Sequence, residues 1–207
     1  MARPRATEAA RRAREEVYRQ GIFEAAERVF AEKSFEETKI QEIADAAGLS
    51  VGTIYGIFES KAQLYQEVHA ERLRELLEVS RASIEGIAGV EKILLEGIGA
   101  YVGYLVAHPN YLRMHLRAGE SWALGPSGPS SEELQAWREG IELEAAILRQ
   151  GIDEGIVIDE DPVLLAKTAT AMHQVVLSDW IASGMKAPPE AVVQRAKDLV
   201  RKTLFRR

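Results

Sequence analysis

The amino-acid sequence predicts an all-α protein with a small N-terminal three-helix unit and a larger C-terminal helical domain. Apolar residues recur at helical spacing along most of the chain, and no stretch alternates convincingly with period two. Capping residues, glycines and prolines mark helix ends at many places. The turn "AAGLS", residues 46–50, joins two of the predicted helices as a helix-turn-helix does.

Composition narrows the class of protein. The chain has 207 residues, 46% of them hydrophobic and 28% charged, which is typical of a globular protein. No apolar run approaches the roughly 18 residues of a membrane span, and the N-terminus lacks the apolar core of a secretion signal. Cysteine is absent, which excludes disulfides and thiolate metal sites. We therefore expect a cytoplasmic protein with no membrane partner and no cofactor.

The N-terminal unit begins with a helix from about Thr7 to Lys33. Its first part is rich in arginine and forms either a basic arm or a solvated tail: Arg3, Arg5, Arg11, Arg12, Arg14 and Arg19. We expect Ser34 to adopt a left-handed conformation after this helix. Three further helices are predicted from their N-terminal caps, with capping-box partners for the first and third: Thr38 with Gln41, Ser50, and Ser60 with Gln63.

Five more helices are predicted in the second half. They begin near Val90, Tyr111, Ser130, Asp161-Pro162 and Pro188-Pro189. Ser130 with Glu133 forms a capping box, and a proline at the first helical position favours the last two starts. The segment "GPSGPSS", residues 125–131, is rich in turn-forming residues and is predicted to be a loop beside Trp137.

The helix-turn-helix is the strongest functional signal. Gly48 suits a left-handed turn, and Ile54 and Phe58, four residues apart, face the core with Ile57. In such units the second helix enters the major groove of DNA. The positions left near the outside are Val51, Gly52, Thr53, Tyr55 and Gly56. An ordinary turn between two packed helices is the alternative interpretation.

Residues 21–68 resemble the DNA-binding region of the tetracycline-repressor-like (TetR) family of transcriptional regulators. The most specific stretch is "AGLSVGTIYGIFESK", residues 47–61, which fits the family's pattern at each fixed position. The rest of the chain resembles the family only in its helical architecture. The resemblance implies three parts: a DNA-binding domain at 1–68, a linking part of the fourth helix at 69–84, and a ligand-binding and dimerisation domain at 85–207.

The resemblance also implies which residues contact DNA: Thr38, Lys39, Ser50, Val51, Gly52, Thr53, Tyr55, Gly56 and Lys61. Thr38, Tyr55 and Lys61 would grip the phosphate backbone, while Val51, Gly52 and Thr53 would approach base edges. The chain departs from the family pattern at three places: Val51 stands where a polar residue is frequent, Gly56-Ile57 where an aromatic or polar pair is frequent, and Ser34 where glycine is usual.

Aromatic, methionine and histidine side chains of the second half are candidates for a small-molecule cavity. They are Tyr101, Tyr104, Met114, His115, Trp137, Met172 and His173. Plain core packing is the alternative for each of them. The four histidines show no pair at the spacing of a helical metal site, so no metal is expected.

These features predict a ligand-responsive regulator, a repressor, that binds a palindromic operator as a homodimer. A small, mostly apolar effector would release it, and Ala100 and Gly103 would face the effector. The last two helices would build a four-helix dimer interface, with an apolar stripe from Val192 to Leu204 on the last one and the small residues Ala166, Ala169 and Ala171 on the one before it. An all-helical enzyme or small-molecule carrier with a structural helix-turn-helix is the alternative, although the chain shows no nucleophile–base pair or phosphate loop.

Overall fold

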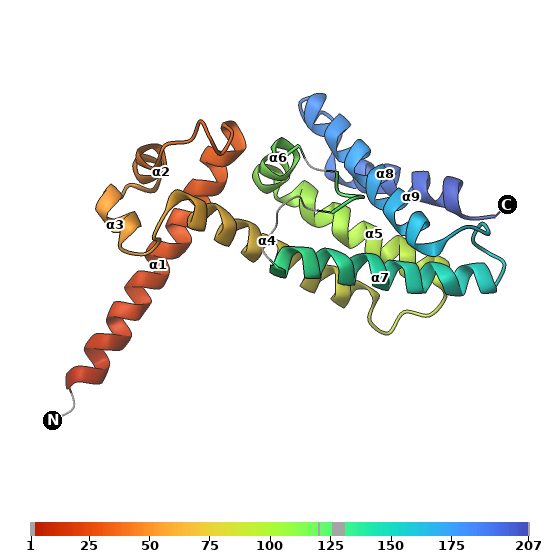
Figure 1. The fold of residues 1–207 in the computed structure, drawn as a ribbon, viewed down its shortest axis with the longest axis horizontal. Coiled ribbons are helices and arrows are strands. Elements are labelled where there is room, and N and C mark those ends of the chain that lie inside the picture. Colours follow the sequence, from red (N-terminus) through yellow and green to blue (C-terminus); the bar gives the residue numbers. More distant parts are fainter. Residues whose placement is uncertain (1–2, 120, 126–130, 207) are drawn as a thin grey trace.

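The structure of the protein, a computed structural model, describes residues 3–119, 121–125 and 131–206, and in these ranges every regular element is a helix (Figure 1). The all-α prediction is confirmed. The helices are α1 (Arg3–Glu32), α2 (Ile40–Ala47), α3 (Val51–Tyr55), α4 (Lys61–Ile84), α5 (Val90–Ala107), α6 (Pro109–Arg117), α7 (Ser131–Asp153), α8 (Pro162–Ala182) and α9 (Pro189–Leu204). Within the described residues, no helix has the length and hydropathy to cross a membrane.

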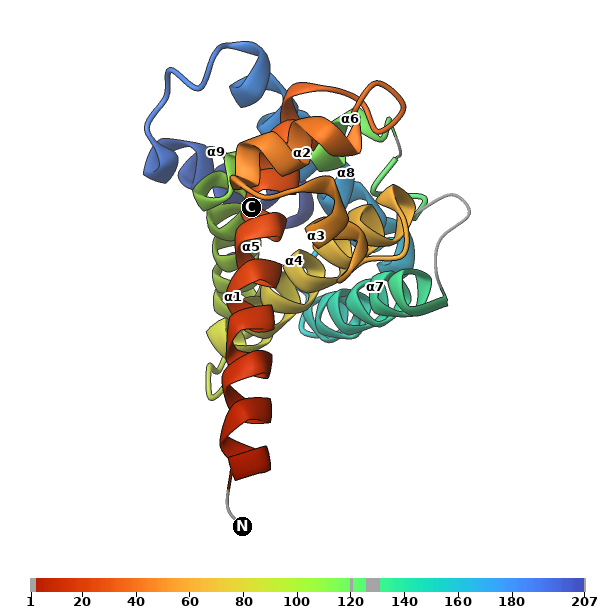
Figure 2. The ribbon, with the colours of Figure 1, turned by 90° about the vertical axis from the view of Figure 1, so that its left-hand side faces the viewer.

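The N-terminal unit has its own hydrophobic core. It is built from α1, α2, α3 and the start of α4, and its largest fully buried side chains are Ile22, Phe30, Ile43, Ile54, Phe58 and Leu64. The first half of α1 extends away from the rest of the molecule (Figure 2). The side chains of Arg3, Arg5, Arg11 and Arg12 lie outside the described part, so the basic arm stays a prediction.

Most predicted helix starts in this unit agree with the structure. The Ser50 and Ser60 hydroxyls accept hydrogen bonds from the backbone N–H groups of Thr53 and Gln63, and Gly48 has the left-handed φ of 67°. The predicted cap at Thr38 is wrong, because Lys39 occupies the N-cap position. There the Glu42 carboxylate accepts a 3.0 Å hydrogen bond from the Lys39 backbone N–H.

Ser34 does not adopt the predicted left-handed conformation. Among the described residues other than glycine, only Met185 has a positive φ. Instead, the Ser34 N–H and hydroxyl both donate to the Glu37 carboxylate, and the Glu37 N–H donates back to the Ser34 hydroxyl. This reciprocal pair closes the turn after α1 without a left-handed residue, so the reason for expecting glycine there disappears.

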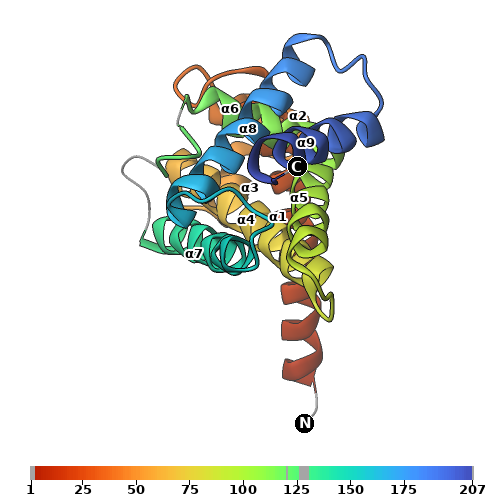
Figure 3. The same cartoon turned by 90° about the vertical axis from the view of Figure 1, so that its right-hand side faces the viewer.

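The C-terminal domain packs α5 against α4, α7 and α9, with α8 between α7 and α9 (Figure 3). The Asp161 carboxylate caps α8 by accepting from the Leu164 N–H, as predicted. Ser130 and residues 126–130 of the predicted loop lie outside the described part.

The apolar stripe predicted to form the dimer interface is covered by the chain itself. The members that carry the stripe are buried in the C-terminal core: Val192, Ala196, Val200 and Leu204. Helix α9 is covered by α5 and α8. These four residues are therefore not available to a second copy, whereas Leu199 of the same stripe is exposed, and a dimer built by the last two helices stays a prediction.

Candidate DNA-binding and ligand-binding sites

The surface of α3 is small and nearly apolar. Ile54 anchors the helix in the core, and Tyr55, with half of its side chain exposed, points outward. The Thr53 hydroxyl lies 2.9 Å from the Ser50 hydroxyl, and the two are hydrogen-bonded. The Thr53 methyl group is thus the part of this side chain best placed for an apolar contact with thymine.

Two glycines leave open space on this surface. A Cβ at Gly52 would meet only the Ser50 hydroxyl, at 3.7 Å, and one at Gly56 would meet helix carbonyls at 3.4 Å. Gly56 has ordinary right-handed angles, so the fold does not require glycine there. These positions let another molecule approach the α3 backbone closely.

Thr38 and Lys61, two of the residues predicted to contact phosphate, form hydrogen bonds within the protein instead. Thr38 is 2% exposed and its hydroxyl donates to the Ser34 carbonyl at 2.9 Å. The Lys61 ammonium donates to the carbonyls of Phe35 and Thr38 and lies over the Phe35 ring. Lys39 differs from both, because it is exposed and no salt bridge joins its ammonium to another described residue. It is the cation of the predicted set best placed to reach phosphate.

The C-terminal domain contains one large apolar cavity of about 450 Å³. Its walls come from α4, α5, α6, α7 and α8, together with Ser121, Trp122 and Gly125 before α7. This volume lies in the range of small-molecule sites, which are mostly apolar with a few placed polar groups. Gly125 has a left-handed φ of 84° and packs so closely on the Trp137 ring that a Cβ would clash with it.

Four of the seven predicted ligand residues line this cavity: Tyr101, His115, Trp137 and His173. The other three lie elsewhere. Met114 packs into the core of the N-terminal unit, Met172 packs against the C-terminal core, and the Tyr104 hydroxyl donates to Glu75. Ala100 and Gly103 are not among the lining residues either, and a Cβ at Gly103 would approach Val193 of α9. Gly140 lines the cavity instead, and a Cβ there would meet nothing within 4 Å.

Glu144 is the lining residue that sequence reasoning missed. It lies on the face of α7 that also presents Trp137, Gly140 and Ile141 to the cavity, a helical spacing that could have revealed it. Burial raises the pKa of Glu144 to about 8. No described residue forms a salt bridge or hydrogen bond with its carboxyl group. The cavity therefore contains a carboxyl group without a cation beside it.

Three imidazoles line the cavity and are neutral near pH 7. Burial lowers the pKa of His69 to about 3, and the charge of His115 contributes to this shift. Burial also lowers the pKa values of His115 and His173 to about 4. Within the described part of the chain, no group of three or more histidine and acidic side chains is arranged to hold a metal ion.

A line of rings connects the cavity with the N-terminal core. The Phe30 ring meets Tyr65 edge-on with centroids 4.9 Å apart, and Tyr65 lies 4.7 Å from His69. His69 lies 5.9 Å from His115, which stacks on Trp122 at 4.7 Å. These contacts form a continuous series of rings from the cavity wall to the N-terminal core.

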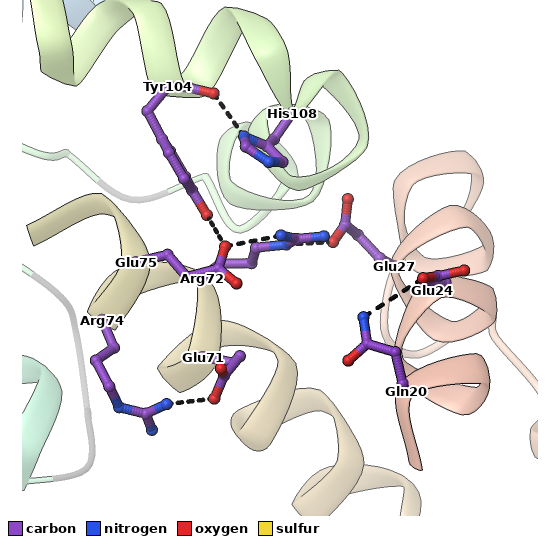
Figure 4. A network of polar contacts seen from close by, with 9 residues as sticks. All are labelled: Gln20, Glu24, Glu27, Glu71, Arg72, Arg74, Glu75, Tyr104 and His108. Atoms are coloured by element: carbon purple, nitrogen blue, oxygen red, sulfur yellow. Dashed lines mark hydrogen bonds and ion pairs between the residues drawn. The ribbon is translucent and has the colours of Figure 1, made fainter. Parts of the chain in front are cut away.

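A polar network joins α1, α4 and α5 (Figure 4). Arg72 of α4 donates to Glu27 of α1 at 2.7 Å and to Glu75 at 2.8 Å, and the Tyr104 hydroxyl of α5 donates to Glu75. Burial opposes the charge of Arg72, but the hydrogen bonds to Glu27 and Glu75 outweigh it and raise the pKa of Arg72. Because Glu27 is 7% exposed, loss of Arg72 would leave a buried carboxylate unpaired.

Known proteins share this arrangement. The pattern of the family described as bacterial regulatory proteins, tetR family, matches residues 22–68. The repressor KstR2 of Mycolicibacterium smegmatis is 28% identical over 87 residues, 39% of this chain and 42% of that protein. The probable acrEF/envCD operon repressor of Escherichia coli K12 is 40% identical over 62 residues, 29% of this chain and 28% of that protein. Both matches span less than half of the curated relative.

The fold agrees over a longer stretch. The structure of the ketosteroid transcriptional regulator KstR2 of Mycobacterium tuberculosis superposes with a TM-score of 0.78 at 23% identity and covers 91% of this chain and 95% of that one. At this identity the likeness shows the fold. The family match at residues 22–68 agrees with the helix-turn-helix geometry of that segment. It also agrees with the similarity to two repressors. Residues 22–68 therefore match the tetR family of bacterial regulatory proteins, within a chain that has the fold of a solved transcriptional regulator.

Proposed function

We propose that the protein is a ligand-responsive repressor that binds a palindromic operator as a homodimer and releases it when a small, mostly apolar molecule enters the cavity. The observation that carries this proposal is the cavity itself, whose walls include residues of α4 and α6, and both of these helices contact α1. The proposed division is residues 1–68 for DNA binding, 69–84 for the link and 85–207 for ligand binding and dimerisation.

The proposed DNA contacts centre on α3. Val51, Gly52, Thr53 and Gly56 would lie against base edges, and Tyr55 and Lys39 would contact phosphates. Ser50 contributes by capping α3 and orienting the Thr53 hydroxyl. Thr38 and Lys61 would act indirectly, by holding the segment between α1 and α2 in position.

The proposed dimer interface uses the outer face of α8. Leu164 and Val175 are large apolar residues with 52% and 65% of their surface exposed, and Thr168 and Ala171 lie between them at helical spacing. Leu199 of α9 is also exposed. An exposed apolar stripe of this kind is typical of a self-association surface. It keeps the last two helices as the interface and leaves out the members of the α9 stripe that are buried.

The proposed release mechanism is a change in the spacing between the two recognition helices. A ligand between α4, α6 and α7 would press on His69 and His115, which continue through Tyr65 to the core beneath α3. The ligand must bind the free form more tightly than the DNA-bound form. A hundredfold ratio corresponds to about 2.7 kcal/mol.

A cavity-filling variant tests the proposal. An operator is first selected from random duplexes, and small apolar molecules that raise the melting temperature are then tested for release of that duplex by fluorescence anisotropy. Gly140→Phe should keep operator affinity and lose the response, because the ring would occupy the cavity. Ala146→Phe, on the exposed side of the same helix, is the matched control and should keep both. Ligands that bind in the cavity yet never change operator affinity would contradict the proposal.

A further inference from the structure

Polar atoms without partners converge on the cavity. Three buried side-chain atoms make no hydrogen bond within the described part of the chain: Ser80 Oγ, Trp122 Nε1 and His173 Nε2. All three residues line the cavity. Buried polar groups in proteins are normally hydrogen-bonded, so three such atoms in residues of one wall favour a ligand with polar as well as apolar parts, which would reach them after a small side-chain movement.

Glu144 determines the sign of the charge that this ligand can carry. The two other charged residues in the wall are Arg81 and Glu139, which pair with each other at 3.1 Å and are largely exposed at the rim. The imidazoles of His69, His115 and His173 have lowered pKa values and carry no positive charge near pH 7. Among the described residues, the interior thus offers one acidic group and no cation.

Aromatic rings surround the same space. Tyr65, Tyr101, Tyr111, Trp122 and Trp137 line the cavity. Burial raises the pKa of the Tyr101 phenol, and the charge of nearby Glu144 adds to this shift. The Tyr101 ring lies 5.7 Å from His173. The faces of aromatic rings attract cations, and the attraction is strongest where water is excluded.

We infer that the ligand is an apolar molecule with one cationic ammonium group, which binds against Glu144 and the neighbouring aromatic rings. This inference rests on the ligand-binding role proposed above. Without a partner the buried Glu144 carboxyl group keeps its proton near pH 7, and an ammonium ion beside it would stabilise the ionised form and pair with it. An anionic ligand would oppose ionisation of Glu144 without a compensating cation, and a neutral one would gain nothing from the acidic group as a charge partner.

Three probes with the same ten-carbon chain separate charge from apolar contact: decyltrimethylammonium, decanol and decanoate. Each is titrated into the full-length protein by calorimetry, below its micelle concentration and at pH 8.5. That pH lies above the raised pKa of Glu144, so the carboxylate is ionised. We expect decyltrimethylammonium to bind tighter than decanol by about tenfold or more, and decanoate to bind most weakly.

Glu144→Gln should remove this preference. Its affinity for decyltrimethylammonium should fall by about tenfold or more, while its affinity for decanol stays within about twofold. Glu142→Gln is the matched control, because Glu142 is exposed on the same helix and does not line the cavity. Thermal melting of both variants verifies that they are folded.

The outcomes distinguish the two proposals. If decanol or decanoate binds as tightly as decyltrimethylammonium, the cationic ligand is wrong while the apolar ligand site stands. Retention of the cation preference in Glu144→Gln would likewise overturn the assignment to Glu144. If none of the three probes binds, both the cationic ligand and the proposed ligand site are refuted.

Discussion

The Lys61 ammonium donates a 2.8 Å hydrogen bond to the carbonyl of Thr38, so the first residue of α4 holds the segment that leads into α2. The same nitrogen donates to the Phe35 carbonyl and lies 4.2 Å from the centre of the Phe35 ring. Together these contacts satisfy backbone carbonyls between two helices, which would otherwise lack a partner. Lys61 therefore supports the DNA-binding unit from within.

Lys61→Ala should lower stability as well as DNA affinity. Loss of the charged donor leaves the two carbonyls without it, at a cost of about 1–3 kcal/mol. For a chain of this size that corresponds to roughly 2–4 °C in melting temperature per kcal/mol. Circular-dichroism melting and anisotropy with a selected duplex measure the two effects. Lys39→Ala is the control and should weaken DNA binding alone. An unchanged melting temperature for Lys61→Ala would support a direct phosphate contact instead.

Ser34→Gly should destabilise the protein, the opposite of what a left-handed residue would predict. Glycine removes the hydroxyl that accepts from the Glu37 N–H and donates to its carboxylate. It also adds freedom to the unfolded chain, worth roughly 0.4–1 kcal/mol. Urea unfolding of Ser34→Gly and Ser34→Ala measures both contributions, with the glycine variant expected to be the less stable. A glycine variant more stable than the parent would restore the left-handed interpretation.

Local signals were sufficient to predict the helix-turn-helix. The caps at Ser50 and Ser60, the left-handed Gly48 and the buried Ile54 depend on neighbours within a few residues, so their positions can be read from spacing. The succession of helices in this unit could be predicted for the same reason, because each helix end is marked by residues next to it in the sequence. Thr38 was misread because it and Lys39 are adjacent and both suit a helix start, and the choice depended on Glu42.

Contacts between distant segments were beyond such reasoning. The partners of Lys61 lie more than twenty residues away, and its role depends on how α1 returns to α4. The stripe of α9 is apolar whether α5 or a second copy covers it, so amphipathicity alone could not decide. Glu144 was overlooked because an acidic residue on a helix is usually solvated, and only the assembled walls of α4 to α8 enclose it.

Val175→Glu should produce folded monomers with weakened operator binding. Val175 is exposed on the outer face of α8, so a charge there costs the folded protomer little but opposes burial against a second copy. Sedimentation velocity measures the oligomeric state, and Val79→Glu, exposed on α4, is the control that should behave as the parent. Val200→Glu should instead unfold the chain, because Val200 is in the core. A Val175→Glu protein that sediments as the parent does would exclude this face from the interface.

Glu144→Gln should stabilise the protein increasingly as pH rises from 5 to 8.5. The pKa of Glu144 is about 8 in the folded chain, against an ordinary value of 4.5. Between these two values the unfolded chain has lost the proton while the folded chain retains it, so rising pH favours unfolding and the full penalty is present above pH 8. Glutamine has no such proton, and its variant avoids the penalty.

The three buried histidines are present in both proteins, so their loss of stability below pH 6.5 cancels in the comparison. Melting temperatures of the parent, Glu144→Gln and Glu142→Gln at a series of pH values measure the effect. The gain for Glu144→Gln should be small at pH 5 and reach several degrees at pH 8.5, while Glu142→Gln follows the parent. A gain that is independent of pH would mean that the Glu144 carboxyl ionises normally and is solvated.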